Sequence, residues 1–223
     1  MKTCVVIPTY NESKAIADII RRIRQYELEV IVVDDGSGDN TASIARGAGA
    51  TVLENQTNEG KGASLIKGFD YALNAGFEAI ITMDGDGQHL PEDIPFFLRL
   101  ANSSPKGLFV GNRMVKTKGM PWVRILTNKF MSWLISAVIK QQISDTQCGF
   151  RLIKKEVLQK IKLKTSKYEI ESELLIEAAR QGFEIEAIPI ETVYAGEKSQ
   201  INPFIDTLRF IKFIARQKWI SRH

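Results

Sequence analysis

The sequence predicts an α/β fold in which a mostly parallel sheet carries helices on both faces. The chain has 223 residues, 44% of them hydrophobic, which is enough to bury a large core. Short β-rich runs alternate with helical patterns through the first half of the chain. These runs are apolar on successive residues, which is typical of strands that are covered on both faces.

The first half is expected to alternate strand and helix at regular intervals. Strands are predicted at Cys4–Ile7, Val30–Val33, Thr51–Leu53, Ala79–Met83 and Leu108–Val110. Helical patterns lie between them, at about residues 12–25, 40–48, 60–75 and 92–101. Asp39 or Asn40 can cap the second helix, and Pro91 suits the first turn of the fourth. Connections of this kind are almost always right-handed and join parallel strands.

The second half is less regular and opens on a long helix from Pro121 to Ile139. Its apolar side chains form one broad face: Trp122, Ile125, Leu126, Phe130, Trp133, Leu134 and Ala137. The uncharged part, Phe130–Ile139, is about half as long as a bilayer-spanning helix. Further helices are expected near 154–161 and 170–181, followed by a strand at Glu184–Ile190.

A last helix, at about residues 203–219, is expected to be amphipathic. Its apolar stripe is Phe204, Leu208, Ile211 and Ala215, and its basic stripe is Arg209, Lys212 and Arg216. Such a helix either docks on its own domain, which is the commoner case, or lies on a membrane surface.

The composition indicates one domain in a reducing compartment. No internal repeat, low-complexity tract or linker divides the sequence, so residues 1–223 are expected to form a single domain. No signal peptide opens it. Cys4 and Cys148 lie far apart and have no metal-binding spacing. These features predict a cytoplasmic protein.

Charge is divided unevenly along the chain. Residues 1–110 hold 10 Lys and Arg against 15 Asp and Glu, whereas residues 111–223 hold 20 against 11. An acidic half binds a diphosphate only with a cation between them, and a basic half suits a lipid phosphate or an anionic membrane. Nucleic acid is not expected as a partner, because aromatic residues are not interleaved with the charges as a stacking platform needs.

The run Asp84-Gly85-Asp86-Gly87-Gln88 follows the fourth predicted strand. Ligands of open parallel sheets bind beyond the carboxyl ends of the strands, and paired carboxylates there suit Mg²⁺ or Mn²⁺. Asp and Gly also end strands simply because they form turns. A calcium loop of the EF-hand type is disfavoured, since Gln88, His89 and Pro95 stand where it needs other residues. A phosphatase of the haloacid-dehalogenase type also carries Asp-x-Asp after a strand, but that strand usually opens the domain. Here the motif follows the fourth predicted strand, which disfavours this class.

Two other predicted strands also end in polar turns. Pro8-Thr9-Tyr10-Asn11-Glu12 follows the first strand, and Asp34-Asp35-Gly36-Ser37 follows the second. All three turns are expected at one edge of the sheet. The first turn lacks the G-x-G-x-x-G pattern of a dinucleotide-binding dehydrogenase, which disfavours that class.

Seven motifs in this order resemble glycosyltransferase family 2, and within it the polyprenyl-phosphate sugar synthases of the dolichyl-phosphate mannose synthase type. The resemblance runs from Val5 to about Ile214. The motifs are Ile7-Pro8-Thr9-Tyr10-Asn11-Glu12, Val32-Val33-Asp34-Asp35-Gly36-Ser37, Asn58-Glu59-Gly60-Lys61-Gly62, Met83-Asp84-Gly85-Asp86-Gly87-Gln88-His89, Gly111-Asn112-Arg113, Asp145-Thr146-Gln147-Cys148-Gly149-Phe150-Arg151 and Gly196-Glu197-Lys198-Ser199.

The resemblance implies the family's GT-A fold, with a nucleotide-sugar-binding half at residues 1–112 and an acceptor-binding half at residues 113–223. It implies that a GDP- or UDP-hexose is bound by Pro8, Tyr10, Glu12, Asp34, Asp35, Gly85, Lys198 and Ser199. It assigns Mg²⁺ or Mn²⁺ to Asp84, Asp86 and Gln88, and the phosphate of a lipid acceptor to Arg113 and Arg124. Many relatives continue into transmembrane helices that this sequence lacks, so peripheral contact with the inner membrane face is expected.

The predicted activity is a metal-dependent, inverting transfer of a sugar from a nucleotide sugar to a polyprenyl phosphate. The expected catalytic groups are Asp86, Arg113, Arg124 and Asp145. A phosphate acceptor is already an anion, whereas a sugar hydroxyl needs a general base, for which Asp145, Glu169, Glu171 and Glu173 are candidates. Two alternatives stay open: a family-2 transferase acting on a saccharide hydroxyl in cell-wall or surface-polysaccharide synthesis, and a non-catalytic nucleotide-sugar-binding or membrane-scaffolding module.

Overall fold

The structure, a computed structural model, describes residues 1–193 together with Phe210, Phe213 and Ile214. Its strands are β1 (Thr3–Thr9), β2 (Glu29–Asp34), β3 (Thr51–Glu54), β4 (Ala79–Thr82), β5 (Leu108–Asn112), β6 (Arg151–Lys154) and β7 (Ile185–Pro189). Its helices are α1 (Ile16–Arg24), α2 (Thr41–Gly47), α3 (Lys61–Asn74), α4 (Ile94–Ser103), α5 (Trp122–Ile139), α6 (Lys155–Lys160) and α7 (Ile170–Arg180). Two short 3₁₀ helices also form, η1 (Pro91–Asp93) and η2 (Arg113–Val115).

The strands form one seven-stranded sheet in the order β3-β2-β1-β4-β6-β5-β7. β1 pairs in parallel with β2 and β4, β2 pairs in parallel with β3, and β5 pairs in parallel with β7. β6 is antiparallel to both of its neighbours, β4 and β5. The predicted α/β fold with a mostly parallel sheet is confirmed, and β6 is a strand that the sequence pattern did not predict.

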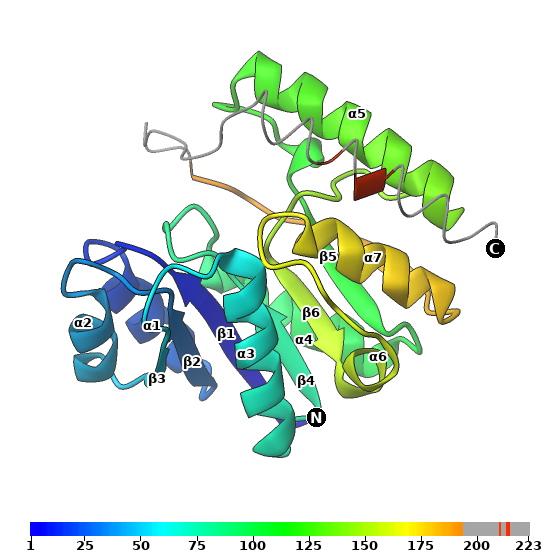
Figure 1. Cartoon of the computed structure of the whole chain (residues 1–223). Helices are drawn as coiled ribbons and strands as arrows, with labels where there is room; N and C mark the ends of the chain where they lie inside the picture. The colour runs from blue at the N-terminus through cyan, green and yellow to red at the C-terminus, as the bar shows by residue number, and fades with distance from the viewer. Residues whose placement is uncertain (194–209, 211–212, 215–223) are drawn as a thin grey trace.

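Helices cover both faces of the sheet (Figure 1). α3 crosses one face against β1 and β2 and meets α7 there, while α1 and α4 lie on the other face. The side chains of Cys4–Ile7 in β1 and Ala79–Ile81 in β4 are completely buried, as their successive apolar residues predicted. Cys148 is buried as well, and burial raises the pKa of this thiol and of Cys4 to about 12.

The helix α1 begins later than predicted, at Ile16 rather than near residue 12. The preceding residues form turns, in which the N–H groups of Ala15 and Ile16 both donate to the carbonyl oxygen of Glu12 at 3.1 Å. Asn11 has a left-handed backbone with φ of 58°, which a helix does not allow. The segment Asn11–Ala15 therefore extends the loop that follows β1.

The long helix α5 forms as predicted but packs with a different face. Its buried side chains are Asn128, Met131, Ser132, Ile135 and Ile139, and it packs on α7 (Figure 1). Most of the predicted apolar face is solvent-exposed: Trp122, Leu126, Phe130 and Trp133. The helix carries apolar residues on two sides, so periodicity alone did not identify the side that packs.

The predicted helix at 203–219 lies outside the described residues except at three positions. Phe210, Phe213 and Ile214 are helical and buried against the core, whereas both predicted stripes fall on residues that are not described. Among the described helices, none combines the length and the apolarity that crossing a bilayer requires.

Candidate active site

The loops that follow β1 and β2 are joined at the carboxyl edge of the sheet. The side-chain oxygen of Asn11 accepts a hydrogen bond from Gly38 N at 2.9 Å, and Ser37 Oγ accepts one from Asn11 N at 2.9 Å. Pro8, just before this loop, is buried in β1, whereas Tyr10 within it is 38% exposed. The network therefore presents Tyr10 to solvent at the edge of the sheet.

Asp34 and Asp35 are buried, and both carboxylates bind groups of the protein itself. Asp34 accepts hydrogen bonds from the N–H and the hydroxyl of Ser37, at 3.1 and 2.5 Å. The donors to Asp35 are Asn55 Nδ2 at 2.8 Å, Glu59 N at 2.9 Å and Gly60 N at 2.8 Å. These carboxylates organise the loops at the edge, and their contact with a nucleoside stays a prediction.

The turn after β4 presents Asp84 and Asp86 at the same edge. Asp84 N donates to His89 Nδ1 at 3.3 Å, so the imidazole proton lies on Nε2, which is 4.0 Å from Asp84 Oδ2. Burial lowers the pKa of His89 to about 4, although Asp84 opposes the shift, so the ring is neutral. Asp86 Oδ1 accepts a hydrogen bond from Gln88 N at 2.9 Å.

Two glycines allow the chain to pack closely around this turn. A Cβ atom on Gly85 would lie 2.8 Å from Thr9 Cγ2, so Gly85 lets the turn pack against β1. A Cβ atom on Gly149 would lie 2.6 Å from both carboxylate oxygens of Asp84. Asp84 is therefore supported from behind by the loop that precedes β6.

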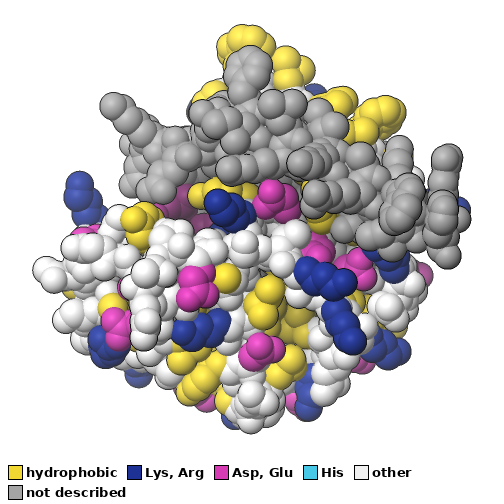
Figure 2. Space-filling view, in the orientation of Figure 1, with side chains coloured by type: hydrophobic (Ala, Val, Ile, Leu, Met, Phe, Trp, Pro, Cys, Tyr) yellow, Lys and Arg dark blue, Asp and Glu magenta, His cyan; other side chains and the backbone are white. Residues whose placement is uncertain are grey.

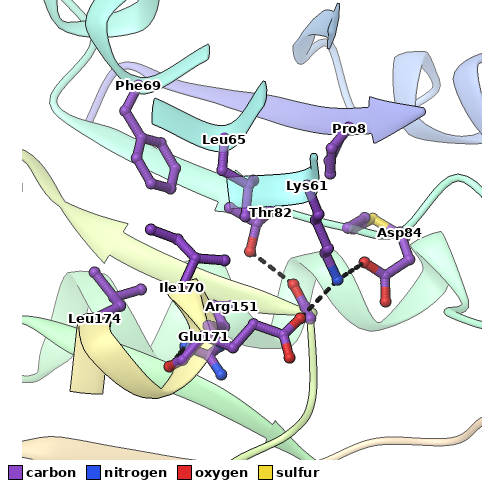
Figure 3. A pocket seen from close by; sticks show the side chains of 12 residues that line it. Pro8, Lys61, Leu65, Phe69, Thr82, Asp84, Arg151, Ile170, Glu171 and Leu174 are labelled. Atoms are coloured by element: carbon purple, nitrogen blue, oxygen red, sulfur yellow. Dashed lines mark hydrogen bonds and ion pairs between the residues drawn. The ribbon is translucent and has the colours of Figure 1, made fainter. Parts of the chain in front are cut away.

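Lys61, the first residue of α3, reaches into this site (Figure 3). Its ammonium lies 2.6 Å from Asp84 Oδ1 and 2.6 Å from Glu171 Oε1, and Glu171 belongs to the first turn of α7. Burial opposes the charge on Asp84, but the ammonium of Lys61 holds the pKa of its carboxyl well below the ordinary value. Burial likewise disfavours the charge on Lys61, and the two carboxylates outweigh it and raise its pKa.

Arg113 and Asp145 form a buried ion pair beside the turn. Arg113 Nε and Nη2 donate to the two carboxylate oxygens of Asp145 at 2.7 and 2.9 Å, and Arg113 N donates at 3.1 Å. Asp145 is completely buried and Arg113 is 4% exposed. Burial would raise the pKa of Asp145, and the hydrogen bonds from Arg113 lower it below the ordinary value.

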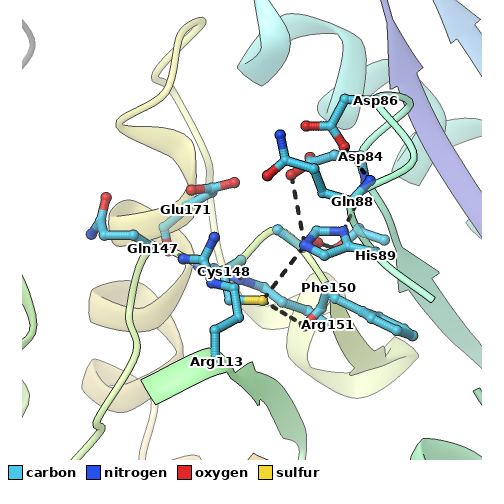
Figure 4. A network of polar contacts seen from close by, with 12 residues as sticks. Asp84, Asp86, Gln88, His89, Arg113, Gln147, Cys148, Phe150, Arg151 and Glu171 are labelled. Atoms are coloured by element: carbon cyan, nitrogen blue, oxygen red, sulfur yellow. Dashed lines mark hydrogen bonds and ion pairs between the residues drawn. The ribbon is translucent and has the colours of Figure 1, made fainter. Parts of the chain in front are cut away.

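Arg151 opens β6 and is 2% exposed. Its guanidinium donates to three backbone carbonyls: those of Cys148 at 2.8 Å, Glu171 at 2.5 Å and Thr146 at 2.9 Å. Figure 4 shows Arg151 in the same polar network as Cys148 and His89. Burial lowers its pKa, against the opposing charge of Glu171. Arg151 therefore ties the loop before β6 to the start of α7, and it positions both the Asp145 and the Gly149 ends of that loop.

The candidate general bases differ in their surroundings. Glu173 is 4% exposed, and its Oε2 accepts hydrogen bonds from Lys164 N at 3.0 Å and from Thr165 N and Oγ1 at 2.9 and 2.7 Å. Glu171 is paired with Lys61, and Asp145 with Arg113. Glu169 is half-buried at the end of α7 that carries Glu171. Three of the four carboxylates are therefore engaged inside the protein.

The chemistry at the turn after β4 fits a divalent cation. Carboxylate and amide oxygens from Asp84, Asp86 and Gln88 are the hard donors that Mg²⁺ and Mn²⁺ prefer. A positive charge is already bound by Asp84, because the ammonium of Lys61 lies 2.6 Å from it. Among the described residues, no group of three or more His, Cys, Asp or Glu side chains is arranged as a metal site. A divalent cation at this turn would therefore have two carboxylate ligands from the protein, Asp84 and Asp86.

The structure brings most of the predicted residues to one edge of the sheet. The end of β1 and its loop contribute Pro8, Tyr10 and Glu12; the turn after β2 contributes Asp34 and Asp35; the turn after β4 contributes Asp84, Gly85, Asp86 and Gln88; and beside it lie Arg113 and Asp145. Arg124 is half-buried in the first turn of α5. Lys198 and Ser199 lie outside the described residues.

The sequence motifs included Lys61 and Arg151 but gave neither residue a role. Lys61 follows Gly60 and precedes Gly62, a spacing that signals close packing of the backbone. Arg151 follows the run Cys148-Gly149-Phe150, which by itself predicts only a buried turn. The signal that could have identified both is their position inside motifs that otherwise carry carboxylates.

Comparison with known proteins gives matches over most of the chain. A family model described as "Glycosyl transferase family 2" matches residues 4–162. The chain is 30% identical over 203 residues to polyprenol monophosphomannose synthase of Mycolicibacterium smegmatis, an alignment that covers 85% of this chain and 76% of the relative. It is 29% identical over 213 residues to UDP-N-acetylglucosamine–dolichyl-phosphate N-acetylglucosaminyltransferase of Methanococcus voltae, covering 85% of each chain.

Solved structures share the fold. Mannosyl-3-phosphoglycerate synthase from Rubrobacter xylanophilus superposes with a TM-score of 0.77 and 18% identity, over 98% of this chain and 75% of that chain. Glucosyl-3-phosphoglycerate synthase from Mycobacterium tuberculosis, crystallised with Mn²⁺, UDP and glucosyl-3-phosphoglycerate, has a TM-score of 0.74 and 18% identity, over 99% and 79% of the two chains. At these identities the likeness concerns the fold.

Proposed function

This chain belongs to glycosyltransferase family 2 and has a GT-A fold, and from that premise we propose that it transfers a hexose from a GDP or UDP sugar to a polyprenyl phosphate. The observation that carries the proposal is the convergence of Asp84 and Asp86 with a buried arginine, Arg113, at the carboxyl edge of the sheet. Relatives whose names specify polyprenol and dolichyl phosphate acceptors support the choice of acceptor. In this proposal residues 1–112 bind the donor and residues 113–223 bind the acceptor.

The reaction is a single in-line displacement. An oxygen of the acceptor phosphate forms a bond to C1 of the sugar while the bond from C1 to the donor diphosphate breaks, and the leaving nucleoside diphosphate takes the electron pair. This displacement inverts the configuration at C1. A divalent cation held by Asp84, Asp86 and Gln88 would neutralise the charge that develops on the leaving group.

The side chains of this protein would act by positioning. Arg113 and Arg124 would hold the acceptor phosphate, because a guanidinium forms paired hydrogen bonds to phosphate oxygens. Asp145 fixes the guanidinium of Arg113 from its other side, through two hydrogen bonds. Tyr10, which is exposed at the edge, would contact the nucleoside, and Lys198 and Ser199 would contact the donor diphosphate.

The surroundings of the candidate bases favour a phosphate acceptor over a saccharide hydroxyl. A hydroxyl acceptor needs a base that can take its proton, whereas a phosphate near neutral pH is already an anion. Asp145 and Glu173 are buried and accept hydrogen bonds within the protein, and Glu171 is paired with Lys61. A transferase for saccharide hydroxyls would have to use Glu169, or release one of these carboxylates from its partners.

A direct transfer assay tests the proposed acceptor. The full chain is incubated with Mn²⁺, a radiolabelled GDP or UDP hexose and a polyprenyl phosphate, and the products are partitioned between organic solvent and water. We expect label in the organic phase only when lipid phosphate is present. Label that appears only in water-soluble saccharide, when a saccharide acceptor is supplied, would contradict the lipid acceptor and favour the alternative.

The exposed face of α5 supports contact with the membrane that holds such an acceptor. Figure 2 shows apolar side chains at the top of the molecule, over α5. The exposed side chains of this face are Trp122 (71%), Val123 (46%), Leu126 (58%), Phe130 (47%) and Trp133 (65%). Residues 114–144 hold no Asp or Glu, and four of their lysines are exposed: Lys116, Lys118, Lys129 and Lys140. An apolar face flanked by positive charge suits an anionic bilayer surface.

We expect that replacing both tryptophans, Trp122→Ser with Trp133→Ser, weakens binding to vesicles of anionic phospholipid at least tenfold. Each substitution removes an exposed indole whose apolar area the bilayer would cover. A loss of about 1.4 kcal/mol of binding free energy is enough to weaken binding tenfold. Flotation of the full chain with vesicles measures the change. Tyr71→Ser, which removes an aromatic side chain that is 40% exposed on α3, is the matched control and should leave binding unchanged. If Tyr71→Ser lost as much vesicle binding as the double tryptophan variant, the exposed face of α5 would not be the membrane contact.

A further inference from the structure

Lys61 joins two carboxylates that come from opposite sides of the site. Asp84 follows β4 and Glu171 lies in the first turn of α7, and the ammonium is 2.6 Å from an oxygen of each (Figure 3). The side chains of Lys61, Asp84 and Glu171 are 16%, 28% and 9% exposed. Two carboxylates this close repel one another in a partly desolvated site, and the ammonium between them compensates that repulsion.

The backbone that carries Lys61 is fixed on both sides. Asp35 accepts hydrogen bonds from the N–H groups of Glu59 and Gly60, at 2.9 and 2.8 Å. The carbonyl oxygen of Ser166 accepts from Gly62 N and Ala63 N, at 2.8 and 3.1 Å. The first N–H groups of α3 are thus bound within the protein, and the side chain of Lys61 starts from a defined position.

Close packing at two glycines fixes the same segment further. Gly60 has φ of +103°, and a Cβ atom on Gly60 or Gly62 would collide with the backbone of Thr165 and Ser166. Glu173 in turn holds Lys164 and Thr165 of that loop. The start of α3 is therefore docked on the segment that leads into α7, which explains how Lys61 can reach Glu171 and Asp84 at once.

We propose that Lys61 is the built-in counter-cation of Asp84, which a divalent ion must displace in order to bind, and that Glu171 retains Lys61 after the exchange. The inference rests on the proposed function in taking Asp84 as a metal ligand. The ammonium and a divalent ion compete for the same carboxylate. The free energy of the Lys61–Asp84 pair is lost when the ion binds, so the ion alone binds weakly.

Glu171 makes this exchange feasible. A buried ammonium that lost its only partner would be left as an uncompensated charge, which is strongly unfavourable. Lys61 has two partners, and Glu171, whose Oε1 lies 2.6 Å from the ammonium in this structure, would remain its partner after Asp84 is released. Removing Glu171 should therefore concentrate the ammonium on Asp84 and make displacement harder. Removing Glu171 and removing Lys61 should therefore change the affinity for a divalent ion in opposite directions.

The test is the affinity of the nucleotide-free full chain for Mn²⁺, measured by calorimetry or by the electron paramagnetic resonance signal of free Mn²⁺. We expect Lys61→Met to bind Mn²⁺ at least tenfold more tightly than the unmodified protein. A cation at this distance typically lowers the pKa of a carboxyl by about one to three units, and it repels a second cation from the same carboxylate in the same way. Glu171→Gln should bind Mn²⁺ more weakly than the unmodified protein. Asp84→Asn should weaken binding further.

Lys67→Met is the matched control, because Lys67 lies on the same helix and its ammonium bonds Glu54 O and Asn55 Oδ1 instead of a site carboxylate. It should leave the Mn²⁺ affinity unchanged. The proposal is overturned if folded Lys61→Met binds Mn²⁺ no more tightly than the unmodified protein, or if Lys67→Met gains as much. Should Lys61→Met not fold, Glu171→Gln decides, and unchanged or tighter binding there overturns the proposal.

The outcome is separable from that of the transfer assay. The Mn²⁺ titrations need neither donor nor acceptor, so a protein that follows the predicted series and yet transfers no sugar would refute the proposed function and leave the role of Lys61 standing. If sugar transfer requires Mn²⁺ but Lys61→Met leaves the Mn²⁺ affinity unchanged, the proposed function stands and the role of Lys61 is refuted.

Discussion

Replacing Asp86 with alanine is expected to lower the rate of sugar transfer by at least about two orders of magnitude, as loss of a positioned electrostatic group typically does. Asp86 lies on the turn after β4, is half-buried, and its Oδ1 accepts a hydrogen bond from Gln88 N at 2.9 Å. Its loss would remove one of the two carboxylates of the proposed cation site. The measurement is kcat at saturating donor and Mn²⁺, with the midpoint of thermal unfolding recorded for each protein.

Asp70→Asn is the control for this variant, since Asp70 is an exposed carboxylate on α3. It should retain full activity. If Asp86→Ala transfers sugar at a rate within threefold of the unmodified protein, the assigned cation site is wrong. If the unmodified protein binds nucleotide sugar and transfers nothing in any assay, a non-catalytic binding module becomes the better description of this chain.

The second large effect is expected on stability. Asp145→Asn should lower the free energy of unfolding at pH 7 by about 3–5 kcal/mol, because it removes one charge of a buried, hydrogen-bonded ion pair while the guanidinium of Arg113 stays buried. Asp145 is completely buried and Arg113 is 4% exposed, and two hydrogen bonds of 2.7 and 2.9 Å join the side chains. Urea unfolding measures the loss. Asp145→Asn combined with Arg113→Met should lose less than the sum of the two single variants.

The pH dependence of this difference has a definite sign. The folded-state pKa of Asp145 lies below its ordinary value of 3.8, so the stabilisation is fully present above that value and is lost as the pH falls through the folded pKa. The gap between the unmodified protein and Asp145→Asn should therefore persist at pH 7 and shrink in acid. Glu92→Gln, which breaks the exposed pair with Arg22, should cost at most about 1 kcal/mol. If Asp145→Asn and Glu92→Gln lowered the free energy of unfolding equally, the buried pair would stabilise the protein no more than the exposed one.

Much of the fold could be predicted because its strands are uniformly apolar. Cys4–Ile7 and Ala79–Ile81 are buried on both faces, and this leaves a run of hydrophobic residues that is easily recognised. β6 escaped prediction because its sequence, Arg151-Leu152-Ile153-Lys154, places two charged residues around two apolar ones. Its first residue is a fully buried arginine whose partners are backbone carbonyls, and no local pattern announces those partners.

The site could be predicted in outline for a related reason. Polar turns after parallel strands must meet at one edge, so the proximity of the turns after β1, β2 and β4 follows from topology alone. The partners of individual carboxylates do not follow from topology. Asp35 holds the start of α3, 24 to 25 residues later, and Asp84 meets Glu171, 87 residues later, only through Lys61. These contacts depend on how helices and loops dock, which spacing in one sequence does not encode.

The reversed direction of β6 has a consequence for where substitutions should matter. A strand that runs against its neighbours delivers its beginning, rather than its end, to the edge where they finish. The segment that enters β6 thus supplies Gly149 behind Asp84, and Thr82 Oγ1 donates to the Gly149 carbonyl at 2.7 Å. A mutational scan of this protein should find its intolerant positions downstream of β1, β2 and β4 but upstream of β6.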